Sequence, residues 1–150
     1  MFKRILVPVD GSETSGKALA AAIALAHEGG GQLHLVHCVD ELTYAGAYEY
    51  AGTLVDLVRQ DGARILEQGL DSCRAAGVEA TSTFIDTPGQ RLGESVAKQA
   101  TDWKADLVVV GTHGRRGVAR MALGSGAEQI IRTATAPVLV IRGNTPPGAG

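Results

Sequence analysis

The chain has 150 residues, enough for one domain with a substantial core, and no shift in composition suggests a second. Hydrophobic residues make up 45%, charged residues 20%, and the net charge is −2, which argues against a nucleic-acid-binding surface. No apolar run approaches the about 18 residues of a membrane span, and the first run, ended by Pro8 and Asp10, is too short for a signal peptide. We therefore expect a cytoplasmic globular protein without a membrane or nucleic-acid partner.

Short apolar runs alternate with stretches of helical periodicity along the chain, and they predict strands and helices respectively. In chain order we expect strands at residues 4–9, 32–39, 78–85, 107–110 and 138–142, separated by helices that begin near residues 12, 53, 87 and 125. Residues 41–52 form a polar, aromatic loop without a predicted structure. The third strand is the most polar, so we place it at a sheet edge.

Capping signals and apolar faces define the helices more closely. Thr87-Pro88-Gly89-Gln90 offers an N-cap, a proline at the first helical position and a capping-box glutamine, while Ser125 and Glu128 form a second capping box. Trp103 follows the third helix and is expected to pack it onto the sheet. One face of the first helix carries Leu19, Ala22, Ile23 and Ala26. The residues of the second helix expected to face inward are Leu54, Val58, Ile65, Leu66 and Cys73, and the third helix runs through Leu92, Val96 and Ala100.

This alternation predicts the α/β class. Right-handed crossovers between consecutive strands give a parallel sheet covered by helices on both faces, a three-layer α/β/α sandwich. We expect a single domain over residues 1–143 and a disordered tail over 144–150, where prolines and glycines gather. Cys38 and Cys73 lack the spacing of a metal site or redox motif, so both thiols are expected to be reduced and buried.

The most informative stretch joins the fourth strand to the last helix. Gly111, Gly114, Gly124 and arginines lie between the buried run and Ser125. Glycines allow an anion to approach main-chain N–H groups closely, and a helix N-terminus favours negative charge. We interpret the stretch as a phosphate-binding loop, with the Ser125 hydroxyl as a further donor. The alternative is an ordinary strand-to-helix turn in which Ser125 only caps the helix.

The spacing Gly111-x2-Gly114-x9-Gly124-Ser125 resembles the nucleotide-binding signature of the universal stress protein family, in its ATP-binding branch. The opening residues 5–12 and the closing residues 136–141 share the resemblance. It implies a five-stranded sheet of order 3-2-1-4-5, an adenine nucleotide alpha hydrolase-like and Rossmann-like fold. The order would reverse between the first and fourth strands and bring Asp10 opposite the Gly111 loop, where ligands bind in such sheets.

Family resemblance places the adenosine half of ATP at Pro8, Val9 and Asp10, with Asp10 near the ribose or base edge. A carboxylate suits paired hydroxyls because it can accept two hydrogen bonds. The alternative for Asp10 is to cap the first helix, for which Ser12 competes. Cys38 and Val110 match positions that line the adenine pocket, and both are equally consistent with plain core residues.

The glycine-rich stretch contains further residues that could contribute to a site. Arg115, Arg116 and Arg120 could neutralise a triphosphate, and Arg115 is included in the predicted site. Gly126 replaces the larger apolar residue more usual in the family, although its amide can still donate to phosphate. His113 is not assigned catalysis, because no second ionisable group is placed in sequence to orient it.

The function expected from the resemblance is that of an ATP-binding regulatory protein of the stress response, not an enzyme. A slow ATP-hydrolysing or self-phosphorylating enzyme and a nucleotide-free dimeric adaptor remain open. A response-regulator receiver domain is disfavoured, because the lysine that such domains carry after the fifth strand is missing. Neither a Walker loop nor a dinucleotide-binding fingerprint is present. Mg²⁺ or Mn²⁺ is expected to arrive with ATP, since it needs few protein ligands.

Assembly can be predicted from the last strand. Residues 138–141 are apolar and β-branched at a predicted sheet edge, where unpaired backbone groups invite a partner strand. We therefore expect a homodimer through Val138–Ile141, which is also what the family resemblance implies. The partners expected are thus an adenine nucleotide and a second copy of the chain.

Overall fold

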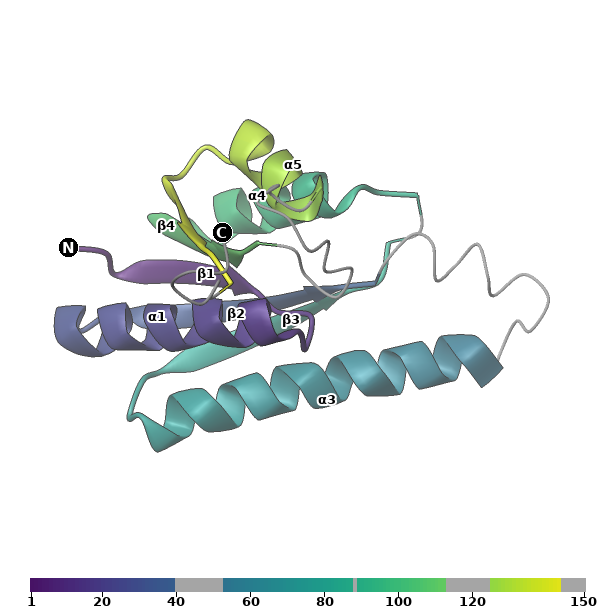
Figure 1. Cartoon of the computed structure of the whole chain (residues 1–150), viewed down its shortest axis with the longest axis horizontal. Helices are drawn as coiled ribbons and strands as arrows, with labels where there is room; N and C mark the ends of the chain where they lie inside the picture. Colours follow the sequence, from purple (N-terminus) through teal and green to yellow (C-terminus); the bar gives the residue numbers. More distant parts are fainter. Residues whose placement is uncertain (40–52, 88, 113–124, 144–150) are drawn as a thin grey trace, which may run out of the picture.

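The computed structural model describes residues 1–39, 53–87, 89–112 and 125–143 (Figure 1). The loop expected at 41–52 and the tail expected at 144–150 lie outside these ranges. The helices and strands in chain order are β1 (Arg4–Pro8), α1 (Glu13–Gly29), β2 (Gln32–Cys38), α3 (Thr53–Ala75), β3 (Ala80–Ile85), α4 (Leu92–Asp102), β4 (Leu107–Gly111), α5 (Ser125–Thr133) and β5 (Val138–Ile141).

The strands form one parallel sheet of order β3-β2-β1-β4-β5. This confirms the predicted order and the positions of β3 and β5 at the two edges. β1 lies at the centre, and its residues Ile5, Leu6 and Val7 are fully buried. An unbroken apolar run is what a strand covered on both faces requires, because side chains alternate between the two faces.

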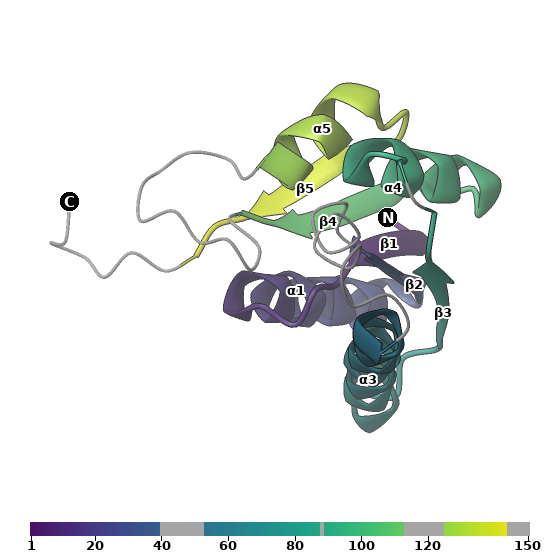
Figure 2. The same ribbon diagram turned by 90° about the vertical axis from the view of Figure 1, so that its right-hand side faces the viewer.

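Helices cover both faces of the sheet, as the three-layer prediction required (Figure 2). One core lies between the sheet and α1 and α3, where Ile65 and Cys73 pack against strand residues such as Leu35. The other core lies between the sheet and α4 and α5, where Val96 and Ile130 pack against residues such as Val36. Leu92 at the start of α4 is 41% exposed.

The predicted start of α4 is wrong. The helix begins at Leu92, and its N-cap is Arg91, which makes no side-chain capping bond. Upstream, the Gln90 N–H donates to the Thr87 carbonyl at 3.3 Å, and Gly89 has a φ of 82°. A left-handed residue interrupts the helical path, so the capping pattern at 87–90 describes a turn that precedes the helix.

Other boundaries differ by one or two residues. β1 ends at Pro8 rather than Val9, β2 at Cys38 rather than Val39, and β3 begins at Ala80 rather than Val78. The Val78 N–H instead donates to the Cys73 carbonyl and helps to close the end of α3, after Gly77 turns the chain at a φ of 70°. α3 ends at Ala75, β5 at Ile141, and β4 runs on to Gly111.

Trp103 fastens α4 to the sheet, as expected. Its ring stacks on His34 of β2 with centroids 5.1 Å apart, and the Arg4 guanidinium lies 4.1 Å from the ring centroid. Arg4 also donates to the Trp103 carbonyl at 2.9 Å through Nε. Burial lowers the pKa of His34, whose ring nitrogens lie within hydrogen-bond distance of the Thr81 and Thr83 hydroxyls.

Both cysteines are free thiols, as predicted. Cys73 is fully buried, whereas Cys38 at the end of β2 is only partly buried. Burial raises the pKa of Cys38 to about 12 and also raises the pKa of Cys73. A thiol that stays protonated at neutral pH is a poor nucleophile, so both behave as small apolar residues.

Candidate functional site

The carboxyl ends of β1 and β4 lie side by side at the centre of the sheet. The two strands pair in parallel with Leu6 opposite Val108, and β1 pairs with β2 on its other side. The chain leaves β1 toward one edge and β4 toward the other, so the strand order reverses between them. Open α/β sheets bind ligands at such a reversal, which makes this end of the sheet the candidate site.

The turn after β1 is held by a series of hydrogen bonds. The Asp10 N–H donates to Ser15 Oγ at 3.1 Å, and the Ser12 N–H donates to Asp10 Oδ1 at 2.8 Å. Gly11 between them has a φ of 82°, a conformation that glycine adopts without strain. Ser12 is the N-cap of α1 and accepts from the Ser15 N–H at 3.2 Å. Ser12 therefore caps the helix, and Asp10 shapes the turn that leads to it.

Gly111 lies against the first turn of α1. A Cβ built on Gly111 would lie 2.6 Å from the Thr14 carbonyl oxygen and 3.1 Å from the Ser15 nitrogen. Real side chains do not approach backbone atoms that closely, so only glycine fits at this position. The contact confirms that residues about one hundred positions apart meet at this end of the sheet. It also means that packing alone accounts for the glycine.

α5 begins at Ser125. The prediction that Ser125 is the N-cap would have made Gly126 the first helical residue, so the helix begins one residue earlier than predicted. A Cβ on Gly126 would lie 2.5 Å from Leu92 Cδ2, so the exposed leucine occupies the space that a larger residue would need. Because this exposed side chain can move aside, the contact does not by itself require a glycine at Gly126, the residue that departs from the usual family pattern. The Ser125 side chain, Gly114, Gly124, Arg115, Arg116, Arg120 and His113 lie outside the described part of the chain.

The residues expected to line an adenine pocket are largely core residues. Val9 is 6% exposed and Val110 3%, while Pro8 and Cys38 are partly buried at the ends of their strands. Val110 and Cys38 both pack in the core beneath α4 and α5. Of the predicted residues, Pro8, Val9, Asp10 and Gly111 gather where the strand order reverses.

One histidine at this end of the sheet was not predicted from the sequence. His37, near the end of β2, is 7% exposed, and its Nδ1 lies 2.8 Å from the Val9 carbonyl oxygen. Thr112 is also buried and lies directly after β4, where its N–H donates to the Ile141 carbonyl at 3.0 Å. A histidine inside an apolar run was the available signal, because a buried imidazole needs a hydrogen-bond partner.

The described residues contain neither a metal-binding cluster nor a membrane-spanning helix. There, no three or more His, Cys, Asp or Glu side chains come together as a metal site would require. No helix in these ranges is both long and apolar enough to cross a bilayer. Asp10, two residues after the end of β1, carries a carboxylate that accepts from the Ser12 N–H.

Comparisons with known proteins agree with this architecture. The model of the universal stress protein family matches residues 1–142. Universal stress protein MJ0531 of Methanocaldococcus jannaschii is 32% identical over 145 residues, which cover 95% of this chain and 83% of that protein. The solved structure of protein MJ0577 is similar with a TM-score of 0.84 at 25% identity, covering 97% of this chain and 99% of that one.

A further solved structure shares the fold and holds a ligand. The universal stress protein of Archaeoglobus fulgidus in complex with dAMP has a TM-score of 0.72 at 21% identity, covering 93% of this chain and 97% of that one. At this identity the likeness shows the fold alone.

Proposed function

The chain belongs to the universal stress protein family, and on that premise we propose that it is an ATP-binding regulatory protein of the cellular stress response. The observation that carries the proposal is the meeting of the Asp10 turn with the end of β4 at Gly111. These segments lie at the reversal of strand order, where nucleotides bind in sheets of this kind. The Archaeoglobus fulgidus protein, which shares the fold, was solved in complex with dAMP, and this supports an adenine nucleotide as the ligand.

The phosphates would lie at the N-terminus of α5. Its first N–H groups have no partners within the helix, and the helix dipole favours an anion there. Glu128 in the first turn would oppose an anion, but its carboxylate pairs with Arg132 at 2.7 Å. Because packing accounts for Gly111, the phosphate contacts are assigned mainly to Gly114, Gly124, Ser125 and the Gly126 amide, with Arg115 offsetting charge.

The adenosine would lie over the Asp10 turn. One Asp10 oxygen accepts from the Ser12 N–H, and a carboxylate can accept several hydrogen bonds, including one from a ribose hydroxyl. Mg²⁺ or Mn²⁺ would be carried by the phosphates, because such ions keep several waters and need few protein ligands. We assign no catalytic residue and propose regulation, in the cytoplasm, rather than catalysis as the function.

A homodimer through β5 is part of the proposal. β5 is an edge strand, and Leu139 on it is 38% exposed, whereas Val138 and Val140 pack on the core beside α5. An apolar edge strand exposes backbone groups that a second copy can satisfy by pairing with them. Light scattering at micromolar concentration should give the mass of a dimer, and a monomeric mass overturns this part.

Calorimetry with magnesium-ATP tests the binding proposal. The wild-type chain should release heat with a single binding event, and Gly114→Ala should weaken binding at least about tenfold by blocking approach to the main chain. Gly16→Ala is the matched control, because a Cβ there meets no atom within 4 Å. No heat with the wild-type chain, or equal affinity for Gly114→Ala and the control, overturns the proposal.

A further inference from the structure

His37 forms a side-chain hydrogen bond to Val9, the residue that directly follows the first strand. Its Nδ1 lies 2.8 Å from the Val9 carbonyl oxygen, and both residues are buried. A carbonyl oxygen can only accept a hydrogen bond, so Nδ1 must carry the proton. The tautomer of this histidine is therefore set by the end of β1.

This bond takes the place of the next rung between β1 and β2. The Val9 N–H donates to the Val36 carbonyl at 2.8 Å, so Val9 still faces β2. In a regular parallel ladder the Val9 carbonyl would accept from the N–H of Cys38, two positions beyond Val36. Within the described residues only the imidazole donates to it. β1 therefore stops pairing here, and the chain is free to turn into the candidate site.

The ring is held from its other side by α3 and β3. A Cβ on Gly62 of α3 would lie 2.7 Å from His37 Cδ2 and 2.2 Å from Phe84 Cε2. The rings of His37 and Phe84 have their centroids 5.7 Å apart. Close packing leaves the imidazole little freedom, so the position of the Val9 carbonyl is defined by the body of the protein.

Hydrogen bonds among its own residues help to hold the turn that follows. Asp10 bonds to Ser15, and Ser12 bonds to both Asp10 and Ser15. His37 thus supplies a contact from outside residues 9–15, and it fixes the point from which the turn starts. A rotation of the Val9 peptide would move the Asp10 carboxylate with it.

We propose that His37 is a positioning residue for nucleotide binding, one that sets the Asp10 turn by holding the Val9 carbonyl. The inference rests on the proposed function, since it assigns His37 to the adenosine end of the same site. His37 does not touch the nucleotide. Its contribution is to hold the end of the first strand in the conformation that binds the nucleotide. The group responsible is the Nδ1–H, which donates to the Val9 carbonyl.

Two nearly isosteric replacements separate the donor from the packing. His37→Asn and His37→Leu both lose the ring, but the asparagine amide can donate from the position of Nδ1. We expect His37→Leu to raise the Kd for magnesium-ATP about tenfold or more, because it leaves a buried carbonyl unpaired beside the site. His37→Asn should stay within about threefold of the wild type, as a replacement that retains the donor.

Destabilisation is controlled with a residue far from Val9. Cys73→Ala opens a small space in the same core, so it lowers stability without changing the donor. Calorimetry is run at a temperature where circular dichroism shows every variant to be folded, and Cys73→Ala should bind as the wild type does. Equal affinity for His37→Leu and the wild type, or equal loss in His37→Leu and His37→Asn, overturns the inference while the proposed function stands. No binding by the wild type overturns both.

Discussion

The two joints between a strand and the next helix at residues 9–12 and 86–91 carry similar sequence signals but fold differently. In the β1–α1 joint, Ser12 caps the helix and Asp10 bonds within the turn. In the β3–α4 joint, Thr87 does not cap α4, and Arg91 stands at the N-cap without a capping bond. A serine or threonine followed three residues later by a potential capping partner, such as Gln90 after Thr87, is therefore not sufficient to start a helix.

The difference lies in the contacts that each helix start makes with the rest of the protein. The first turn of α1 fits against Gly111 of β4, so the sheet fixes where the helix begins. The start of α4 is instead held by α5, because the Gly93 N–H donates to Gln129 Oε1 at 3.1 Å and Thr133 Oγ1 donates to the Gly93 carbonyl at 3.1 Å. Tertiary contacts here replace the cap that the local sequence offers.

Removing the fit between α1 and β4 should have the largest effect. Gly111→Ala places a Cβ 2.6 Å from the Thr14 carbonyl oxygen, and relief requires a shift of backbone rather than of a side chain. We expect a loss of about 3 kcal/mol in the free energy of unfolding, measured by urea denaturation.

Gly16→Ala is the matched control for that substitution. It lies in α1, where a Cβ meets no atom within 4 Å, so the better helix propensity of alanine should stabilise by up to about 1 kcal/mol. If both variants changed stability equally, the close approach of α1 to Gly111 would have no energetic role, and the β1–α1 joint would not depend on the sheet.

The cap itself should have a smaller effect. Ser12→Ala removes the acceptor of the Ser15 N–H, and we expect a loss of about 1 kcal/mol by urea denaturation. Ser12→Thr retains the hydroxyl and should lose much less. A loss in Ser12→Thr as large as that in Ser12→Ala would mean that the hydroxyl does not cap α1.

The β3–α4 joint can be given the cap that it lacks. Arg91 is exposed, and its φ of −70° and ψ of 145° already have the extended conformation of an N-cap. Arg91→Ser adds an acceptor, and Glu94 stands at the third helical position for a capping box. We expect a gain of about 0.5 to 1 kcal/mol in the free energy of unfolding.

A loss of stability in Arg91→Ser would show that the start of α4 depends on the arginine itself. Arg91→Ala is the control, because it removes the same side chain without adding an acceptor. The gain should appear only in the serine variant. Together, Ser12→Ala and Arg91→Ser compare how much one capping hydroxyl contributes to the free energy of unfolding at the starts of α1 and α4.

The order of strands could be predicted from the sequence because it depends on long, redundant patterns. Five apolar runs, four helical stretches and the handedness of crossovers leave few arrangements, and the resemblance to a known family selected one. Element ends were less predictable because single contacts decide them. β1 stops before Val9 because a side chain takes its carbonyl, and β3 starts late because the Val78 N–H closes α3.

The candidate site was predicted only in part for a similar reason. That the Asp10 turn and Gly111 would meet followed from the strand order, and the contact between Gly111 and Thr14 confirms it. The reason for Gly111 could not be predicted. A glycine that lets an anion approach the main chain and a glycine that lets a helix pack closely look alike in sequence. His37 was missed because its partner is a backbone atom, which leaves no trace in side-chain patterns.

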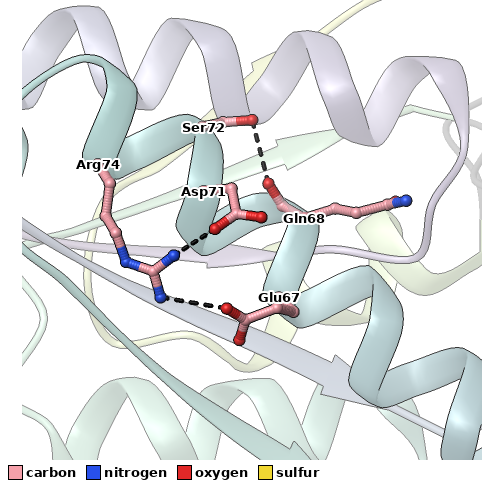
Figure 3. A network of polar contacts seen from close by, with 5 residues as sticks. All are labelled: Glu67, Gln68, Asp71, Ser72 and Arg74. Carbon is pink, nitrogen blue, oxygen red and sulfur yellow. Dashed lines mark hydrogen bonds and ion pairs between the residues drawn. The ribbon is translucent and has the colours of Figure 1, made fainter.

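The smallest effect is expected far from both joints, on the exposed side of α3 (Figure 3). Arg74 forms ion pairs with Asp71 and, at 3.2 Å, with Glu67, and all three side chains are more than half exposed. Exposed ion pairs contribute little because water and salt screen them and their side chains lose entropy. Arg74→Ala should therefore leave the urea midpoint unchanged within error at physiological salt. A shift as large as that of Ser12→Ala would mean that surface charge, rather than hydrogen bonding at helix starts, sets the stability of this fold.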